Sequence, residues 1–253
     1  MKRTVIGRLG GLLAASVLVA AWWGASLIVR APFLPSPPAV MMRLGTLAAG
    51  GALWRHLAAS LARVAAAVAS SFVAAVPLGI LAGRSRALDR LVTPVTYLLA
   101  PVPKIALLPV IMLLAGLGET SRVLVVFLVL FFQMLVAARD GARSVAGAFY
   151  LSIDSLGARP RHRLRYVTWP AVLPSLFTAL RVGIGTALAV LFFAETFGTR
   201  WGLGYFVVES WMRMAYADLY AGVVTFGLVG LALTRLADAA ARRACRWQEI
   251  TSR

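Results

Sequence analysis

The sequence has little cysteine, histidine or acid, and each shortage excludes a class of protein. The single cysteine, Cys245, rules out an internal disulfide and a thiolate metal cluster. The two histidines, His56 and His162, lie far apart and show no metal-ligand spacing. Nine scattered acidic residues offer no nucleophile–base arrangement of the kind that an intramembrane enzyme needs. We therefore expect neither a metal site nor catalytic residues.

Charged residues are also scarce, and apolar residues are correspondingly frequent. Only 14% of the 253 residues are charged, whereas 60% are hydrophobic and the mean hydropathy is +0.83. A soluble chain of this size could not hide so much apolar surface from water, so lipid must surround much of it. The net charge of +17 raises nucleic-acid binding as an alternative. However, the arginines lie between apolar runs, as membrane topology places them, and we expect no nucleic-acid partner.

Long apolar runs predict an all-α integral membrane protein with six transmembrane helices. A run of about 18 residues or more spans a hydrocarbon core of about 30 Å. The first run is too long for a signal peptide and lacks a small-residue cleavage site, so we interpret it as an uncleaved anchor. The six runs are Leu12–Val29, Val64–Gly83, Leu91–Gly118, Val123–Ala138, Ala171–Ala194 and Leu219–Leu233.

The distribution of basic residues predicts that both termini are cytoplasmic. Of the 26 lysines and arginines, 17 fall in segments 1–11, 84–90, 139–170 and 235–253, which alternate with the outer segments. Residues 1–55 form one predicted unit, an anchor helix followed by a proline-rich outer segment whose 31–40 stretch favours extended polyproline structure. Residues 56–253 form the other unit, a core of five helices with a cytoplasmic loop at 139–170.

The cytoplasmic stretch DSLGARPRHRLRYVTWP (154–170) is dense in arginine and turn formers. Glycine at position 157 suits a helix C-cap, and proline at position 160 suits the first turn of a new helix. We expect a helix to end near Gly157 and a short amphipathic helix to run from Pro160 towards Tyr166, where Pro170 stops it before the next span. The residues alone leave open a generic basic loop.

Three prolines interrupt the third predicted span. Proline removes a backbone hydrogen bond, and irregular backbone at membrane depth is tolerated only inside protein or beside a cavity. Pro101, Pro103 and Pro109 therefore predict a broken segment that lines a translocation pathway, with a simple packing kink as the alternative.

Four charged residues fall at or near membrane depth, where charge is costly. Arg63 is expected to reach the outer interface with its long side chain. Lys104 and Arg181 are candidates to pass an anion along the pathway, and Glu195 completes the predicted set. The alternative for Lys104 and Arg181 is a structural bond to carbonyl groups or to Glu195.

Spacing in the basic stretch resembles the motif E-A-A-x-x-x-G-x(9)-I-x-L-P of ATP-binding-cassette (ABC) importer permeases, the binding-protein-dependent transport inner-membrane component family. Gly157, Val167 and Pro170 match, whereas Leu151–Ile153 replace E-A-A and Trp169 replaces leucine. Six further strings, in the family's order, are similar to its nitrate/sulfonate/taurine branch: FLPSPPAV (33–40), HLAASLARV (56–64), VPLGILAGRSR (76–86), PVPKIALLPVIMLLAGLGE (101–119), LPSLFTALRVGIG (173–185) and GLGYFVVES (202–210).

This resemblance implies a type I importer permease of the bacterial inner membrane that pairs with a second copy and takes solute from an extracytoplasmic binding protein. It also implies that cytoplasmic ATPase subunits dock on the loop, with Asp154 taking over part of the role of the missing glutamate. The implied docking residues are Asp154, Ser155, Leu156, Gly157, Ala158, Arg159, Pro160, Val167 and Pro170. The chain has no G-x-x-x-x-G-K-[ST] loop, so ATP would be used by the partner and no cofactor by this chain.

Two alternatives stay open at this point. An ion-coupled secondary transporter would need paired ionisable residues near the midplane, and only Glu195 is available. For the solute, the resemblance favours an organic sulfonate, taurine or a nitrate-like anion, with a neutral vitamin precursor as the alternative.

Overall fold

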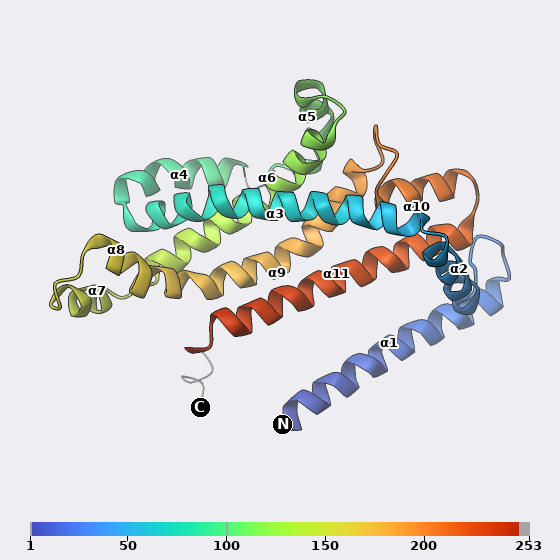
Figure 1. Cartoon of the computed structure of the whole chain (residues 1–253), viewed down its shortest axis with the longest axis horizontal. Coiled ribbons are helices and arrows are strands. Elements are labelled where there is room, and N and C mark those ends of the chain that lie inside the picture. Colours follow the sequence, from blue (N-terminus) through green and yellow to red (C-terminus); the bar gives the residue numbers. More distant parts are fainter. Residues whose placement is uncertain (1, 100, 248–253) are drawn as a thin grey trace.

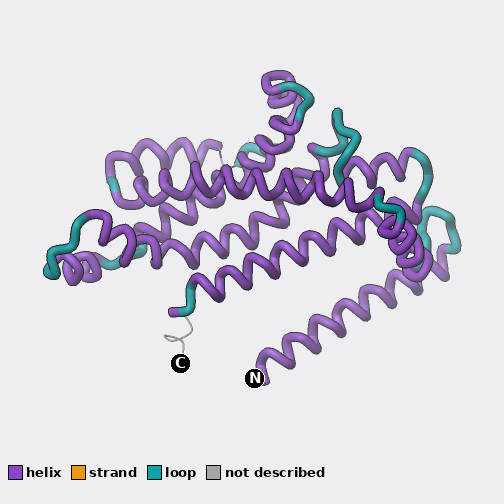
Figure 2. Tube along the Cα trace, in the orientation of Figure 1, coloured by secondary structure: helices purple, strands orange, loops and turns teal. Residues whose placement is uncertain are grey.

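A computed structural model describes residues 2–99 and 101–247, and these residues form helices joined by short loops (Figures 1 and 2). No strand occurs in either range. The helices are α1 (Lys2–Val29), α2 (Pro37–Ala49), α3 (Ala52–Arg84), α4 (Arg86–Leu99), the 3₁₀ turn η1 (Lys104–Leu107), α5 (Leu108–Ala115), α6 (Glu119–Arg143), α7 (Gly147–Asp154), α8 (Pro160–Arg163), the π-helical turn η2 (Leu164–Thr168), α9 (Trp169–Ala194), α10 (Leu203–Met212) and α11 (Tyr216–Ala244).

Four of these helices are long and apolar enough to cross a membrane: α3, α6, the continuous Pro160–Ala194 and α11. The pair α4 and η1–α5 makes a fifth span if its two arms, bent by 85°, are counted together. The remaining predicted span falls on α1, whose apolar part Leu13–Val29 is shorter than these. The predicted all-α membrane architecture is confirmed.

The centre of the fold is a tight contact between α3 and α6, against which α9 packs. Glycines on α3 allow the contact: a Cβ on Gly79 would lie 2.6 Å from the Leu135 carbonyl oxygen of α6. One turn further along, Gly83 lies directly against the Arg139 carbonyl oxygen. The Ser71 hydroxyl of α3 donates to the Phe127 carbonyl oxygen of α6 at 3.1 Å. Small residues of this kind let helices approach closely in lipid.

The short helices α2 and α10 lie together at one end of the long helices, and α7 and α8 lie at the other (Figure 1). We call these the α2–α10 end and the α7–α8 end. The N-terminal end of α1 and the C-terminal end of α11 both point towards the α7–α8 end (Figure 1). The predicted cytoplasmic location of that end stays a prediction, and Met1 and residues 248–253 lie outside the described residues.

The proline-rich segment differs from its predicted extended form. Pro37 and Pro38 open α2, since the first helical turn needs no N–H donors from them. Arg43 of α2 then pairs with Asp218 at the start of α11 through two hydrogen bonds, and the bond to Asp218 raises the pKa of the Arg43 guanidinium. The predicted unit boundary at 55/56 falls inside the first turn of α3, which begins at Ala52.

Candidate functional site: a braced segment between helices and a cavity

The segment between α6 and α9 is shorter than the predicted loop 139–170. Helix α6 continues to Arg143 because its last turns stay packed against α3, so the non-spanning part begins at Ser144. Helix α7 ends at Asp154, and the chain reverses through Gly157, whose φ is +74°. This left-handed conformation strains any residue with a side chain. The predicted helix end and turn are therefore where the sequence places them.

Pro170 does not stop the helix, contrary to the expectation from sequence. Helix α8 runs without interruption through η2 into α9, because η2 is a π turn. The Trp169 N–H donates to the Leu164 carbonyl oxygen five residues back, and the Thr168 hydroxyl donates to the Arg163 carbonyl oxygen at 3.3 Å. A π turn shifts the hydrogen-bond register just before the proline, so the missing N–H and the ring are accommodated.

Three contacts brace this segment. Across the turn, Arg163 Nε donates to Asp154 Oδ1 at 2.6 Å, which ties α8 to α7. The buried Tyr150 hydroxyl lies 3.0 Å from Thr168 Oγ1, which ties α7 to the π turn. The Arg84 guanidinium lies 3.7 Å from the centre of the Tyr150 ring, a cation–π contact with the end of α3. A displacement of α7 would therefore reach both α3 and α9.

The tip of the segment exposes large apolar side chains. Phe149, Leu151 and Leu156 are 65%, 72% and 84% exposed, respectively. Leu156 belongs to the predicted docking set, whereas Phe149 and Leu151 do not. Of the rest of that set, Ser155 caps α7, Ala158 follows the turn, and the Arg159 N–H donates to His162 Nδ1 at 3.3 Å. Pro160 opens α8, and Val167 is half-buried in the π turn.

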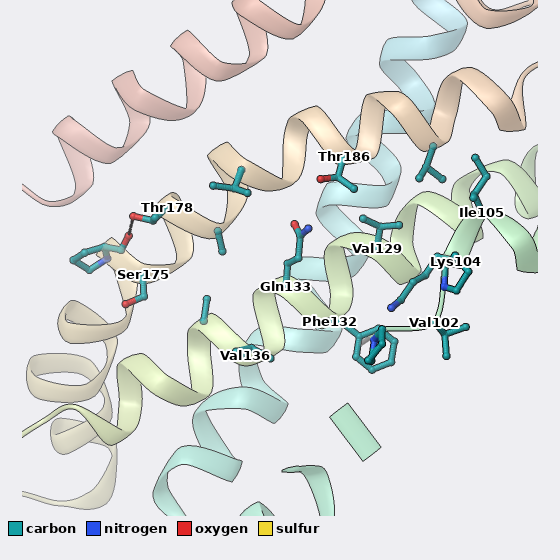
Figure 3. A pocket seen from close by; sticks show the side chains of 17 residues that line it. Val102, Lys104, Ile105, Val129, Phe132, Gln133, Val136, Ser175, Thr178 and Thr186 are labelled. Carbon is teal, nitrogen blue, oxygen red and sulfur yellow. Dashed lines mark hydrogen bonds between the residues drawn. The ribbon is translucent and has the colours of Figure 1, made fainter. Parts of the chain in front are cut away.

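The predicted broken segment forms one wall of a cavity of about 980 Å³. After α4 the chain bends and continues as η1, and Lys104 Nζ donates to the Leu99 carbonyl oxygen across the bend at 2.6 Å. Pro101, Pro103 and Lys104 line the cavity, whereas Pro109 opens α5 outside it. The other walls come from α6 and α9 (Figure 3).

Polar groups on α6 and α9 face the same cavity. Gln133 lies on α6, and Ser175, Thr178 and Thr186 lie along α9 (Figure 3). Lys104 is the one charged residue among the described residues that line it. The rest of the lining is apolar, as is common for small-molecule sites.

Arg181, a predicted pathway residue, lies elsewhere. Its Nη1 donates to Asp238 Oδ1 of α11 at 3.2 Å. The pair lines a separate cavity of about 270 Å³ together with Arg242 and Cys245. The partner of Arg181 is thus an acid of another helix, and among residues 2–99 and 101–247 neither a carbonyl group nor Glu195 binds its guanidinium.

Glu195, also predicted for the pathway, is fully buried in an ion-pair network that we call the Arg63 cluster, formed by Ser60, Arg63, Glu119, Arg122 and Glu195. Arg63 Nη1 donates to Glu195 at 2.7 Å, and its Nε and Nη2 each donate to Glu119 at 2.6 Å. The Ser60 hydroxyl and the Gly204 N–H also donate to Glu195. Arg63 is only 3% exposed, so the expectation that it reaches the interface is wrong: two carboxylates hold it inside.

The cluster fixes the loop between α9 and α10 onto α3 and α6. Arg122 donates to the carbonyl oxygens of Phe197 and Gly198, and Arg63 donates to that of Trp201 at 2.8 Å. Gly202 has a φ of +143°, and a Cβ there would lie 2.5 Å from Glu195 Cδ. Glu195 therefore has a structural role at the α2–α10 end, where it joins α3 to the start of α10, and it does not line the cavity.

No metal centre is built within residues 2–99 and 101–247, where no three His, Cys, Asp or Glu side chains gather. Cys245 is buried just after α11, and burial raises the pKa of its thiol.

Sequence reasoning missed Tyr150, Thr168, Arg84 and Gln133. Isolated polar side chains within apolar runs are the signal for Gln133, because such groups need a partner or a cavity. No sequence signal pairs Tyr150 with Thr168, since their contact depends on the turn and on the π register.

Comparison with known proteins decides the family. Residues 75–246 match the model of the binding-protein-dependent transport system inner membrane component. The chain belongs to this family. The match begins within α3 and runs through α11, so it includes the braced segment, the cavity and the α6, α9 and α11 spans.

Two relatives support the assignment. The chain is 33% identical to the taurine transport system permease protein TauC of Escherichia coli (strain K12), over 92% of this chain and 87% of TauC. It is 28% identical to the putative aliphatic sulfonates transport permease protein SsuC of Bacillus subtilis (strain 168), over 96% of this chain and 88% of SsuC.

The fold is shared with a solved transporter. An inward-facing MetNI methionine ABC transporter structure matches with a TM-score of 0.63 at 19% identity, covering 83% of this chain and 99% of that one. The chain is therefore a multi-pass membrane transport subunit, the permease of an ABC importer with a type I fold.

Proposed function

We propose that this chain is the bacterial inner-membrane permease of an importer for small organic sulfonates such as taurine. A second copy completes the pore, cytoplasmic ATPase subunits drive it, and an extracytoplasmic binding protein delivers the solute. ATP is consumed by the partner, and this chain binds no cofactor.

The observation that carries the proposal is the exposed apolar tip of the braced segment. Phe149 and Leu151 lie on α7 and Leu156 lies in the turn that follows it, and all three side chains are exposed. Helix α7 lies at one end of the long apolar helices that lipid would cover (Figure 1). Exposed apolar side chains on the water side of a protein mark an interaction site. Since the tip is tied to α3 and α9, a partner that pushes on it moves the walls of the membrane core.

The sulfonate assignment is supported by the relatives and by the chemistry of the cavity. TauC and SsuC carry taurine and aliphatic sulfonates in their names. A cavity of about 980 Å³ has room for a small solute, and Lys104 supplies it with positive charge. A neutral vitamin precursor would gain nothing from that charge.

The test uses the permease co-expressed with its ATPase and binding protein. In vesicles containing all three, labelled taurine should accumulate only with ATP and binding protein present. Leu156→Asp should abolish co-purification of the ATPase, because a carboxylate replaces an apolar docking group. Met214→Asp is the matched control, since Met214 is 73% exposed near the opposite end and should leave co-purification unchanged. Uptake without ATP, or normal co-purification of Leu156→Asp, would contradict the proposal.

A further inference from the structure

We propose that the smaller cavity, between α9 and α11, binds the phosphate headgroup of an acidic phospholipid such as phosphatidylglycerol. Arg181 of α9 and Arg242 of α11 hold the phosphate, and an acyl chain lies along the exposed face of α11 that continues from the cavity. The site contacts the membrane and not the solute, so it is independent of the proposed function.

The cavity carries more positive than negative charge. Its volume is about 270 Å³, and its charged lining residues are Arg181, Asp238 and Arg242. Asp238 accepts one hydrogen bond from Arg181, at 3.2 Å, and a guanidinium has five N–H donors. Arg242 is exposed on α11, four residues after Asp238. Two arginines and one aspartate leave one positive charge, which matches the single negative charge of a phosphodiester.

The cavity lies at the depth of the headgroups. Residues 219–234 of α11 contain no charged side chain, and at 1.5 Å per residue they cover roughly 24 Å of a hydrocarbon core of about 30 Å. The charged residues of the helix follow directly: Arg235, Asp238, Arg242 and Arg243. Basic residues that directly follow a membrane span attract anionic headgroups. Arg242 is therefore placed where a lipid phosphate would lie.

An exposed apolar strip on α11 leads from the cavity towards the lipid region. Residues three or four positions apart share one face of a helix. Leu228, Leu231, Arg235, Asp238 and Arg242 follow one another at these intervals. Leu228 and Leu231 are 55% and 54% exposed. Along this face the apolar part comes first and the charged part second, in the order of an acyl chain and its headgroup.

This combination favours a lipid over a soluble phosphate. Pro174 and Phe177 of α9 line the cavity beside the two arginines, so part of its wall is apolar. A soluble phosphate would gain nothing from this wall or from the leucines of α11. A phospholipid buries apolar surface against both, while its phosphate accepts charge-assisted hydrogen bonds from arginine.

The test measures the binding of fluorescent phosphatidylglycerol to the full-length permease in a neutral detergent. Phosphatidylcholine with the same acyl chains is the comparison probe, because its headgroup has no net charge, and it should bind much more weakly. Arg242→Gln and Arg181→Gln should each weaken phosphatidylglycerol binding about tenfold, which corresponds to 1.4 kcal/mol. Asp238→Asn should strengthen it severalfold, because it removes the negative charge that faces the phosphate.

Arg243→Gln is the matched control. Arg243 is exposed beside Arg242 in α11 but does not line the cavity, so its loss should leave the affinity unchanged. The Tm of each variant without lipid reports on folding and should stay close to that of the wild type.

Three results would overturn the lipid site. The first is equal affinity of the wild type for the two lipids. The second is an equal loss of phosphatidylglycerol binding in Arg242→Gln and Arg243→Gln. The third is displacement of the bound lipid by inorganic phosphate, which would assign the cavity to a soluble anion, or by the ATPase, which would assign it to the partner. None of these readouts involves taurine uptake, so the site and the proposed function can fail separately.

Discussion

The two ends of the long helices are held by polar contacts of opposite character. At the α2–α10 end, Arg63 and Glu195 are 3% and 0% exposed, and hydrogen bonds surround both. At the α7–α8 end, the side chains of Arg163 and Asp154 are 42% and 30% exposed. Separating a buried pair is very costly, whereas an exposed pair can open and close at little cost. The difference indicates a fixed end and an adjustable end.

The largest expected effect comes from breaking the buried end. Arg63→Met should destabilise the protein by about 3–5 kcal/mol, because it leaves the fully buried Glu195 carboxylate without its cation. For a chain of this size, the Tm in detergent should fall by roughly 6–20 °C. Arg213→Met is the control: Arg213 is exposed, 3.9 Å from Glu209, and its loss should move the Tm very little. A Tm of Arg63→Met equal to that of the wild type would show that the two ends do not differ in this way.

The next effect tests the turn at the adjustable end. Gly157→Val should abolish transport-coupled ATP hydrolysis while membrane insertion stays intact, because the left-handed conformation costs a residue with a side chain about 1–2 kcal/mol. Gly147→Val is the matched control, since a Cβ there also meets open space and its φ is not left-handed. Coupled turnover in Gly157→Val would contradict the assignment of this turn to ATPase docking.

A smaller effect should follow from loosening the link between α7 and the π turn. Tyr150→Phe removes the hydroxyl that contacts Thr168 and should lower the free energy of unfolding by about 1 kcal/mol. The ring stays, so the Arg84 contact is kept. The ATP hydrolysed per taurine imported should rise, because part of each displacement no longer reaches α9. Tyr166→Phe, at an exposed tyrosine nearby, should leave this ratio unchanged.

The smallest effect is expected at the exposed ion pair. Asp154→Asn should lower the free energy of unfolding by about 0.2–1 kcal/mol. This decrease should become smaller as the salt concentration rises, because salt screens the ion pair. The Tm in detergent, measured from low to high salt, would check this, with Asp140→Asn as an exposed control. A loss as large as that of Arg63→Met would mean that the adjustable end is as rigid as the fixed one.

The sequence predicted the helices well because their signals are local. Apolar length identified the spans, three prolines identified the broken segment, and Gly157 identified the turn. Pro170 was misinterpreted because a π turn depends on hydrogen bonds that the residue pattern does not encode. The rule that proline ends a regular α-helix does not hold here, because the hydrogen-bond register of the helix shifts in the π turn just before Pro170.

The pairing of charges could not be predicted, because it depends on tertiary packing. Arg63 lies near the end of an apolar run, where a long side chain usually reaches water. Its partners are 56 and 132 residues away in sequence. Lys104 lines the cavity beside the broken segment, and its bond to the Leu99 carbonyl oxygen is the structural contact that the sequence left as the alternative, so its part in passing an anion stays a prediction.

The distance in sequence between Arg63 and Glu195 also determines how long after Arg63 its partner is synthesised. The arginine leaves the ribosome 132 residues before the glutamate that it binds. At about 5–20 residues per second, that interval is roughly 7–26 s. During this time Glu119, which follows Arg63 by 56 residues, is the acid of the pair that is available first, and Glu195 joins it only when the second half of the chain has been translated.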